Sequence, residues 1–410
     1  MKQSKSISRR ETMKTYNKTN SSSKSSSATS KYAYYWSSQS VDNGGNNGAT
    51  NDITSSSSGG GSTNKNNGRI LRTTLGAISI TTFIFIWLAS LGSPIYGFYW
   101  CWYGEQYNTP LFVLLVLTLI AYLPWKNNGP FSKSVKAFAR LNTFYYTKCV
   151  VIIQNEQSLP KRPRKETTKT EEQKQNEDGQ QKQQQRQQQQ PILYAVHPHG
   201  AFCLGWSVLF CSKIMDVGKV RFCFSPVLFT SPLFRLWSRL TGHPGSASKA
   251  SMIGYMKKKK TLALPPGGFE EATLTCRNKD RVYIKKRTGF VKLALKHGYT
   301  LCPVYCFGEN QTYDNIQGLW NYRLWLNKLG LPAIFVFGSW LGPLLPKRDD
   351  RGIRIVVGEP IVLPTLSDPS REDVQHWHNK YIAGLIQTFE DHKEEYYSSD
   401  IAKTQKLEIW

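Results

Sequence analysis

The segment Ile192–Met215, with the sequence ILYAVHPHGAFCLGWSVLFCSKIM, decides the fold of this chain. Its first five residues form a continuous apolar run that favours a buried strand, HPHG interrupts the run, and the remainder has helical length and apolar spacing. Pro198 fixes its own φ and biases His197 toward extended backbone, while Gly200 allows close approach to the backbone. We therefore predict a strand, a stiff turn that holds His199, and a helix.

The same order of elements occurs twice more along the chain. In TLALPPGGFEEA, which starts at residue 261, a strand-like run is followed by a Pro-Gly turn and by two acids that suit a helix start. In YTLCPVYCFGEN, an apolar run at 299–307 ends in Gly308, Glu309 and Asn310. Strands that alternate with helices predict an α/β fold with a mostly parallel sheet flanked by helices.

Ligands bind outside the carboxyl ends of the strands in open α/β sheets. We therefore expect His199, Glu271 and Glu309 to converge there, although they lie far apart in the sequence. A neutral imidazole is a suitable base for removing a proton from an alcohol near neutral pH, and backbone N–H groups of the turn would stabilise an oxyanion. Two alternatives stay open: the histidines cap the turn by hydrogen bonds, or they bind a metal. No HExxH motif or Cys/His cluster supports metal binding.

One polar segment precedes the folded part of the chain, and a second interrupts the expected domain 126–410. Residues 1–68 are rich in Ser, Asn, Thr and Gly and are expected to be a disordered tail. A segment at about 154–190, which ends in QNEDGQQKQQQRQQQQ, is expected to be a low-complexity insertion that loops out of the fold.

The net charge of +25 is spread along all 410 residues, and no nucleic-acid-binding signature occurs. The basicity therefore favours an anionic membrane surface or ligand and not nucleic acid. The eight cysteines form no CxxC pair and are interpreted as reduced apolar residues.

A hydrophobic hairpin is predicted at residues 70–125. No charged residue occurs between Arg72 and Glu105, and the window 106–125 is also uncharged. Lys and Arg flank the outer ends, so the positive-inside rule places both ends, and the domain 126–410, in the cytosol. The second window is shorter, which leaves open whether the hairpin is transmembrane or re-entrant.

Several motifs in order, HPHG, PGGFEEA, KKRTGFVKLALKHGYTLCPVYCFGEN and VGEPIVLP, closely resemble the type 2 diacylglycerol acyltransferase family, which includes monoacylglycerol and wax-alcohol acyltransferases. The resemblance implies a membrane-anchored acyltransferase domain in a multi-pass enzyme of the endoplasmic reticulum and lipid droplets. Such an enzyme transfers a fatty acyl group from acyl-CoA, its substrate, to diacylglycerol without a cofactor or metal. Monoacylglycerol or fatty-alcohol acceptors, a non-catalytic lipid-droplet scaffold and a homo-oligomer all stay open.

The resemblance also implies roles for particular residues. His199 would be the base, His197 would support it, and Glu271 fills the acidic position of the family loop, with Glu270 as an alternative. Supporting or substrate-binding roles are expected for Pro198, Gly200, Gly267, Gly268, Glu309 and Asn310, and the cluster Lys285, Lys286 and Arg287 would either meet CoA phosphates or form a solvated surface.

Related phospholipid acyltransferases have an HxxxxD motif whose aspartate orients the histidine, but Phe202 and Leu204 occupy the corresponding positions here. Glu271, Glu309 or a backbone carbonyl would then orient the His199 ring. The loop PPGGFEEA carries two acids and no cation, which would repel a phosphorylated acceptor and favours an uncharged alcohol.

Overall fold

The computed structural model describes residues 14–15, 32–36, 61–103, 108–123, 129–160, 190–329 and 333–410. In these residues a sheet of ten strands lies between two layers of helices, which confirms the predicted α/β class. Its strands are β1 (Lys14–Thr15), β2 (Tyr32–Trp36), β3 (Cys149–Ile153), β12 (Ile353–Val357), β9 (Thr300–Phe307), β4 (Ile192–His197), β7 (Leu262–Leu264), β5 (Arg221–Phe224) and β6 (Pro244–Ser246) in spatial order, with β13 (Ile361–Val362) beside β9.

The centre of the sheet is parallel, as the alternation of strands and helices predicts. Strands β9, β4, β7, β5 and β6 pair in parallel, and β3 pairs in parallel with β12. Strand β12 runs antiparallel to β9, so the direction of the sheet reverses there. Two-stranded sheets join β10 (Asp314–Asn315) to β11 (Val336–Phe337) and β14 (Leu407–Ile409) to β8 (Asp280–Val282).

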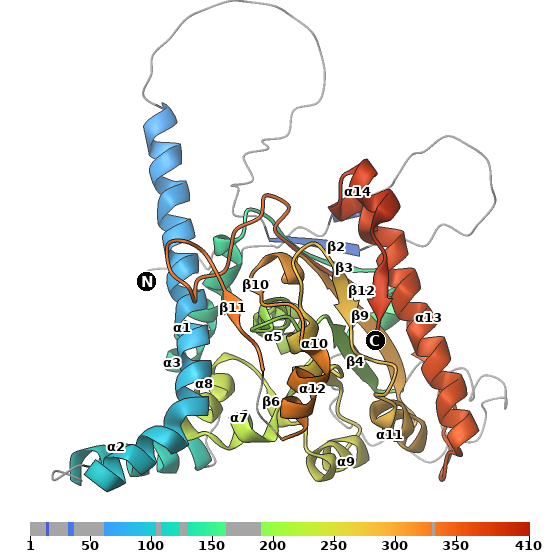
Figure 1. Ribbon diagram of the computed structural model, residues 1–410, viewed down its shortest axis with the longest axis horizontal. Helices are drawn as coiled ribbons and strands as arrows, with labels where there is room; N and C mark the ends of the chain where they lie inside the picture. Colours follow the sequence, from blue (N-terminus) through green and yellow to red (C-terminus); the bar gives the residue numbers. More distant parts are fainter. Residues whose placement is uncertain are drawn as a thin grey trace, which may run out of the picture.

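Helices cover both faces of the sheet because the central strands are apolar on both sides. In β4, Tyr194 and Val196 belong to one buried cluster, and Leu193 and Ala195 belong to the other. The first cluster includes residues of α1 (Gly61–Tyr103), α5 (Leu204–Cys211), α6 (Lys213–Val217), α7 (Pro226–Thr230) and α8 (Pro232–Thr241). The second cluster includes residues of α9 (Lys249–Lys257), α11 (Gly289–His297), α13 (Arg371–Tyr396) and α14 (Ser399–Thr404). Figure 1 shows α1 and α13 on opposite sides of the molecule. The remaining helices are α2 (Asn108–Tyr122), α3 (Pro130–Arg140), α10 (Gly268–Leu274) and α12 (Trp320–Lys328), with short 3-10 turns at Leu141–Tyr145, Glu156–Ser158 and Glu309–Gln311.

The predicted hydrophobic hairpin forms two helices, α1 and α2. Among the described residues, one segment, Asn66–Ser90 of α1, is long and apolar enough to cross a membrane. One side of α1 packs on the domain through Ile80 and Ile84, whereas Phe85 is 64% exposed. Helix α2 has 15 residues, which is shorter than a span normally requires. The structure therefore supports one candidate span, and the second arm of the hairpin stays a prediction.

Both polar segments are shorter than the sequence suggests. Within the expected tail, β2 pairs with β3 at the sheet edge and α1 already begins at Gly61, so disorder does not hold for these parts. At the expected insertion, Ser158 is fully buried and its hydroxyl donates to the Gly358 carbonyl. The Gln190 side-chain amide donates to the Leu363 carbonyl. Residues 154–160 and Gln190 therefore belong to the fold, and the rest of the insertion, 161–189, lies outside the described residues.

Candidate active site

The HPHG turn lies at the carboxyl end of β4, between the ends of β7 and β9. It is the place where a parallel sheet presents its ligand site. The peptide bond between His197 and Pro198 is cis. His197 is fully buried, whereas His199 is 8% exposed and borders a cleft. The two histidines, two residues apart, therefore have different surroundings.

His197 is held by buried partners on both sides of its ring. Its Nδ1 lies 3.0 Å from Oε2 of Glu271, and its Nε2 lies 3.1 Å from the hydroxyl of Tyr381 on α13. A carboxylate only accepts hydrogen bonds, so Nδ1 carries the proton and Nε2 accepts from the tyrosine. Both nitrogens are occupied, which makes His197 a fixed support and not a free base. The sequence alone does not reveal Tyr381, because it lies 184 residues away.

The carboxylate of Glu271, on α10, ties several segments together. Besides the His197 ring, it accepts hydrogen bonds from the backbone N–H of His199 at 2.6 Å and of Tyr283 at 2.8 Å. Glu271 is 1% exposed, so these donors replace water around its charge. A Cβ on Gly267 would come within 2.1 Å of the same carboxylate, which explains a glycine in the loop at this position. Glu271 thus fixes the turn through the backbone of His199 and through the ring of His197.

The His199 ring is oriented by a backbone carbonyl, one of the three candidates considered. Its Nδ1 lies 2.9 Å from the Gly200 carbonyl oxygen, which can only accept, so Nδ1 carries the proton. The lone pair is then on Nε2. Burial lowers the pKa of His199 below its usual 6.5, against smaller effects of the Gly200 carbonyl and nearby acids. The ring is therefore neutral at pH 7 with Nε2 able to accept a proton.

Cys203 is a neighbour of His199 that the sequence interpretation missed. Its Sγ lies 3.2 Å from both Nδ1 and Nε2 of His199, and the residue has φ of +53°, which is uncommon outside glycine. Burial raises the pKa of this thiol well above its usual range, so it is a neutral group in contact with the imidazole ring. The four-residue spacing from His199 was the signal in the sequence.

Glu309 lies beneath the start of α5 and not beside the histidine rings. Its carboxylate accepts from the backbone N–H of Leu204 at 3.0 Å and of Gly205 at 2.5 Å. Burial raises the pKa of Glu309 to about 7, although these two N–H groups lower it. Gly200 has φ of +65°, and a Cβ there would come within 2.0 Å of Glu309. Glu309 therefore positions the turn and the helix.

Three backbone N–H groups around the turn are already engaged, which narrows the choice of donors for the predicted oxyanion contact. The N–H groups of His199, Leu204 and Gly205 already donate to Glu271 and Glu309. They cannot also stabilise an oxyanion without losing those carboxylates. The oxyanion contact therefore stays a prediction for the other N–H groups of the turn, at residues 200–203.

The other predicted site residues have contacts of their own. Glu270 forms an ion pair with Arg287, so one acid of the PPGGFEEA loop is neutralised by a cation. Gly268, at φ of +59°, begins α10 beside this pair. Lys285 and Lys286 are exposed. The Asn310 side-chain amide donates to Asp280 at 3.0 Å and belongs to a separate buried network. Because Arg287 pairs with one of the two loop acids, the loop repels a phosphorylated acceptor less strongly than its sequence predicts.

The cleft beside His199 is lined mostly by apolar side chains. Its cavity volume is about 50 Å³, and its walls include Phe83 and Trp87 of α1 and Phe269 of α10. Trp206, Phe224, Leu228 and Phe234 line it as well. Among the described residues that line it, His199 is the one Asp, Glu, Lys, Arg or His side chain. A neutral imidazole at an apolar cleft is a site suited to general-base chemistry on an uncharged, apolar molecule.

Comparison with known proteins gives the family. The family model described as diacylglycerol acyltransferase matches residues 180–410, which contain both histidines, Glu271 and Glu309. The chain belongs to the diacylglycerol acyltransferase family.

Individual relatives have different printed activities. The chain is 31% identical over 238 residues to human diacylglycerol O-acyltransferase 2, covering 53% of this chain and 60% of the relative. It is 31% identical to human acyl-CoA wax alcohol acyltransferase 2, covering 52% and 68%, and 32% identical to mouse 2-acylglycerol O-acyltransferase 1, covering 50% and 66%. The chain thus matches about three fifths of the length of the first of these relatives.

Proposed function

We propose that this protein is an acyl-CoA-dependent O-acyltransferase that esterifies diacylglycerol to triacylglycerol. Membership of the family supports acyl transfer. The observation that carries the proposal is the position of His199, a neutral base whose cleft is lined by apolar side chains and by the apolar helix α1. A lipid alcohol is the substrate class that such a cleft accepts, because its chains replace water there without burying a charge.

In the proposed reaction, His199 acts through Nε2. The hydroxyl oxygen of the acceptor attacks the thioester carbonyl carbon of acyl-CoA while Nε2 takes the hydroxyl proton. The carbon–sulfur bond then breaks, and the imidazolium returns the proton to the CoA thiolate, giving an ester and CoA. His197, Glu271 and the Gly200 carbonyl keep the ring in place throughout.

A second acceptor class has support of its own. Relatives whose names specify wax alcohol and 2-acylglycerol acceptors are about as similar to this chain as those named for diacylglycerol. An apolar cleft accepts any of these alcohols, because they differ in the amount of hydrocarbon and share the hydroxyl group that reacts. Monoacylglycerol or long-chain alcohol transfer is therefore the alternative proposal.

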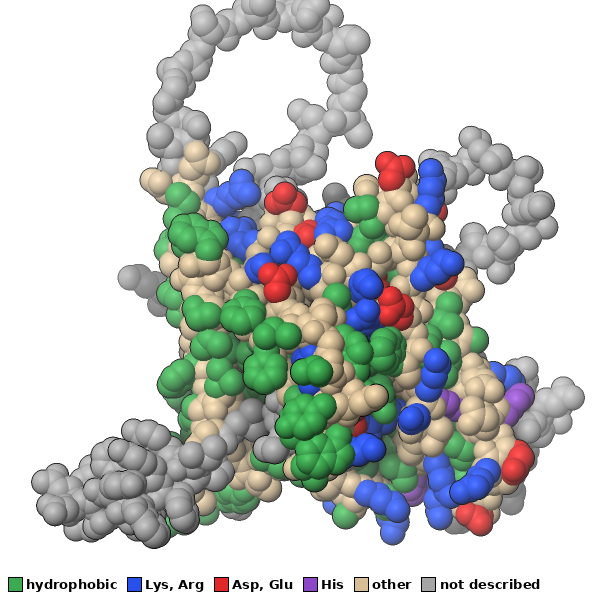
Figure 2. Space-filling view, in the orientation of Figure 1, with side chains coloured by type: hydrophobic (Ala, Val, Ile, Leu, Met, Phe, Trp, Pro, Cys, Tyr) green, Lys and Arg blue, Asp and Glu red, His purple; other side chains and the backbone are tan. Residues whose placement is uncertain are grey.

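We also propose that the protein works in the endoplasmic-reticulum membrane and on lipid droplets. One segment of α1 could span a bilayer by length and composition. Figure 2 shows hydrophobic side chains gathered over α1 and in the region of α12 and β11. Leu319 and Trp340 are 79% and 92% exposed there. Exposed apolar patches of this kind suit a lipid surface.

The experiment gives membranes that contain the protein labelled acyl-CoA and one of four acceptors: diacylglycerol, monoacylglycerol, a fatty alcohol or lysophosphatidic acid. Labelled triacylglycerol should be the main product. Dominant monoacylglycerol or alcohol esterification would replace diacylglycerol by the alternative acceptor, and dominant lysophosphatidic acid acylation would refute an uncharged acceptor.

A matched pair of variants tests the base. His199→Ala should lower the turnover by a factor on the order of 10² to 10⁴. His376→Ala removes an exposed histidine on α13 and should leave turnover unchanged. Unchanged turnover in His199→Ala, at equal expression, would remove His199 from the reaction.

A further inference from the structure

A second concave site lies at the other end of β5 from the His199 cleft. Phe224, at the end of β5, lines the cleft, whereas Arg221, at its start, lines the second site. We call the second site the arginine pocket; it is lined by Arg221, Phe229, Arg235, Arg239, Gly242, His243 and Pro244. Its cavity volume is about 220 Å³, and it is open to solvent.

Cations converge on the arginine pocket from two elements. Arg221 belongs to β5, while Arg235 and Arg239 are four residues apart on α8 and therefore project from one face of the helix. Burial lowers the pKa of Arg239, and the positive charge of Arg235 lowers it further. Like charges held this close are unfavourable unless an anion joins them.

In the described part of the chain, Arg221 and Arg235 contact neutral partners. Arg221 donates to the Pro244 carbonyl at 2.7 Å and lies over the Tyr255 ring. Arg235 lies over the rings of Tyr122 and Phe229 at 4.2 and 4.6 Å. Within the described part of the chain, its buried Nε makes no hydrogen bond. The rings hold the Arg235 guanidinium in place without compensating its charge.

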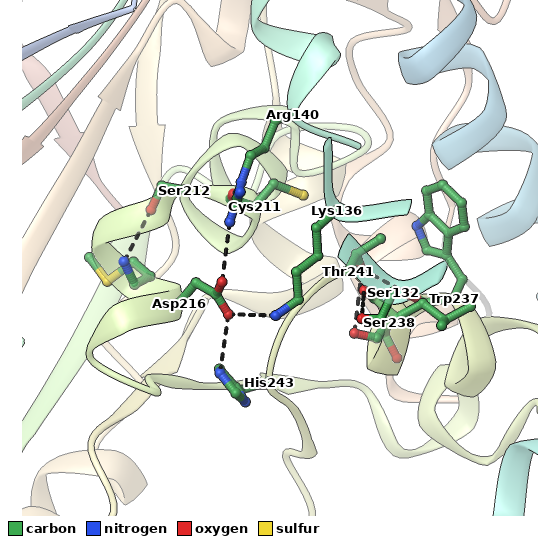
Figure 3. A network of polar contacts seen from close by, with 12 residues as sticks. Ser132, Lys136, Arg140, Cys211, Ser212, Asp216, Trp237, Ser238, Thr241 and His243 are labelled. Carbon is green, nitrogen blue, oxygen red and sulfur yellow. Dashed lines mark hydrogen bonds and ion pairs between the residues drawn. The ribbon is translucent and has the colours of Figure 1, made fainter. Parts of the chain in front are cut away.

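The nearest acid in the ion-pair network does not neutralise the pocket. Figure 3 shows Asp216 at the centre of Lys136, Arg140 and His243. Its carboxylate lies 2.8 Å from Lys136, 3.2 Å from Arg140 and 3.2 Å from Nε2 of His243. One negative charge is thus shared with two cations outside the pocket, and its contact with His243 holds that ring at the rim. Within the described residues no acid pairs with Arg221 or Arg235, so their two positive charges remain uncompensated.

The arginine pocket adjoins the end of the apolar helix α2. Arg239 donates to the carbonyls of Ala121 and Leu123, and the Tyr122 hydroxyl donates to Thr230 beside α8. A ligand in the pocket therefore sits beside an apolar helix end, where an amphiphile can place its charged group.

We propose that the arginine pocket binds a phosphate group. Clustered guanidinium groups suit phosphate because their planar forks donate paired hydrogen bonds to its oxygens. Two sources offer this group: the 3′-phosphate of CoA and the headgroup of an anionic phospholipid. Only the first source rests on the proposed acyl-CoA reaction; binding itself does not depend on it.

The test measures binding to the purified full-length protein in detergent micelles by isothermal titration calorimetry. One arm compares CoA with 3′-dephospho-CoA. The other compares mixed micelles that carry phosphatidic acid with micelles that carry phosphatidylcholine. Arg235→Gln should weaken binding of at least one phosphate ligand about tenfold or more, since a charge-assisted hydrogen bond is lost. Arg371→Gln, an exposed arginine at the start of α13, should leave binding unchanged.

The two comparisons identify which molecule supplies the phosphate group. A loss seen with CoA but not with 3′-dephospho-CoA assigns the CoA 3′-phosphate, and a loss confined to phosphatidic acid assigns the lipid headgroup. Wild-type affinity of Arg235→Gln for both ligands would overturn the proposal, whatever the enzymatic activity. If Arg235→Gln lowers the melting temperature so far that it cannot be titrated, Arg221→Gln decides by the same criteria.

Discussion

Replacing Glu271 by glutamine tests the network on which the candidate active site depends. Three N–H donors converge on this carboxylate: Nδ1 of His197 and the backbone amides of His199 and Tyr283. Glutamine keeps one acceptor oxygen but turns its NH₂ group toward at least one of these donors. A buried donor left without an acceptor costs about 1–3 kcal/mol, and the charge assistance of the other bonds is lost as well.

We therefore expect Glu271→Gln to lower the free energy of unfolding by roughly 3 kcal/mol. That corresponds to a fall in melting temperature of about 6 to 12 °C for a domain of this size, measured by thermal shift in detergent. Turnover with acyl-CoA and diacylglycerol should fall about a hundredfold, because the His199 backbone is no longer fixed.

Glu270→Gln is the matched control for this substitution. Glu270 pairs with the partly exposed Arg287, and such pairs contribute about 0–1 kcal/mol. The control should therefore melt close to the wild-type protein and keep most of its turnover. A larger effect from Glu270→Gln than from Glu271→Gln would refute the assignment of Glu271 as the positioning carboxylate.

Three further outcomes are expected. Because burial lowers the pKa of His199 and the base must be neutral, kcat/KM should be flat above pH 7 and fall only at pH values below about 6.5; a midpoint above 7 would contradict this. Gly308→Ala should lower the free energy of unfolding by more than about 1 kcal/mol in thermal shift, because φ is +91° and the new Cβ would lie 2.3 Å from the Gly352 carbonyl oxygen. The control Gly254→Ala in α9 should be neutral or stabilising, because its new Cβ meets no atom within 4 Å. Replacing residues 161–189 by a short Gly/Ser linker should preserve turnover, but extending the deletion through Ser158 should lower the melting temperature, because the Ser158 carbonyl accepts from Tyr194 in the core.

The sequence predicts the fold well where the determining signals are local. The apolar run and the turn at 192–200 follow from patterns within about twenty residues, and the structure has β4 and the turn there. The helix expected up to Met215 is interrupted at Ser212, which is extended and divides it into α5 and α6. Both glycine turns after β7 and β9 are found where the sequence places them. The parallel pairing of β4 with its neighbours follows from the same alternation.

The contacts of the site were harder to predict because they depend on packing between distant elements. Sequence order does not say that Glu271 faces the His197 ring, that Tyr381 closes the other side of that ring, or that Glu309 accepts from the start of α5. The predicted start of the Gln-rich insertion was wrong for a similar reason. Composition marks residues 154–160 as polar, but hydrogen bonds of Ser158 join this stretch to the fold.

Helix α1 contributes Phe83 and Trp87 to the wall of the His199 cleft, although it lies before the segment that the family model matches. A shortened chain that starts after residue 125 would lack both of these side chains. The His199 cleft would then lose one wall, and the imidazole would be open to water. A version of this protein without α1 would therefore need other apolar side chains to rebuild that wall.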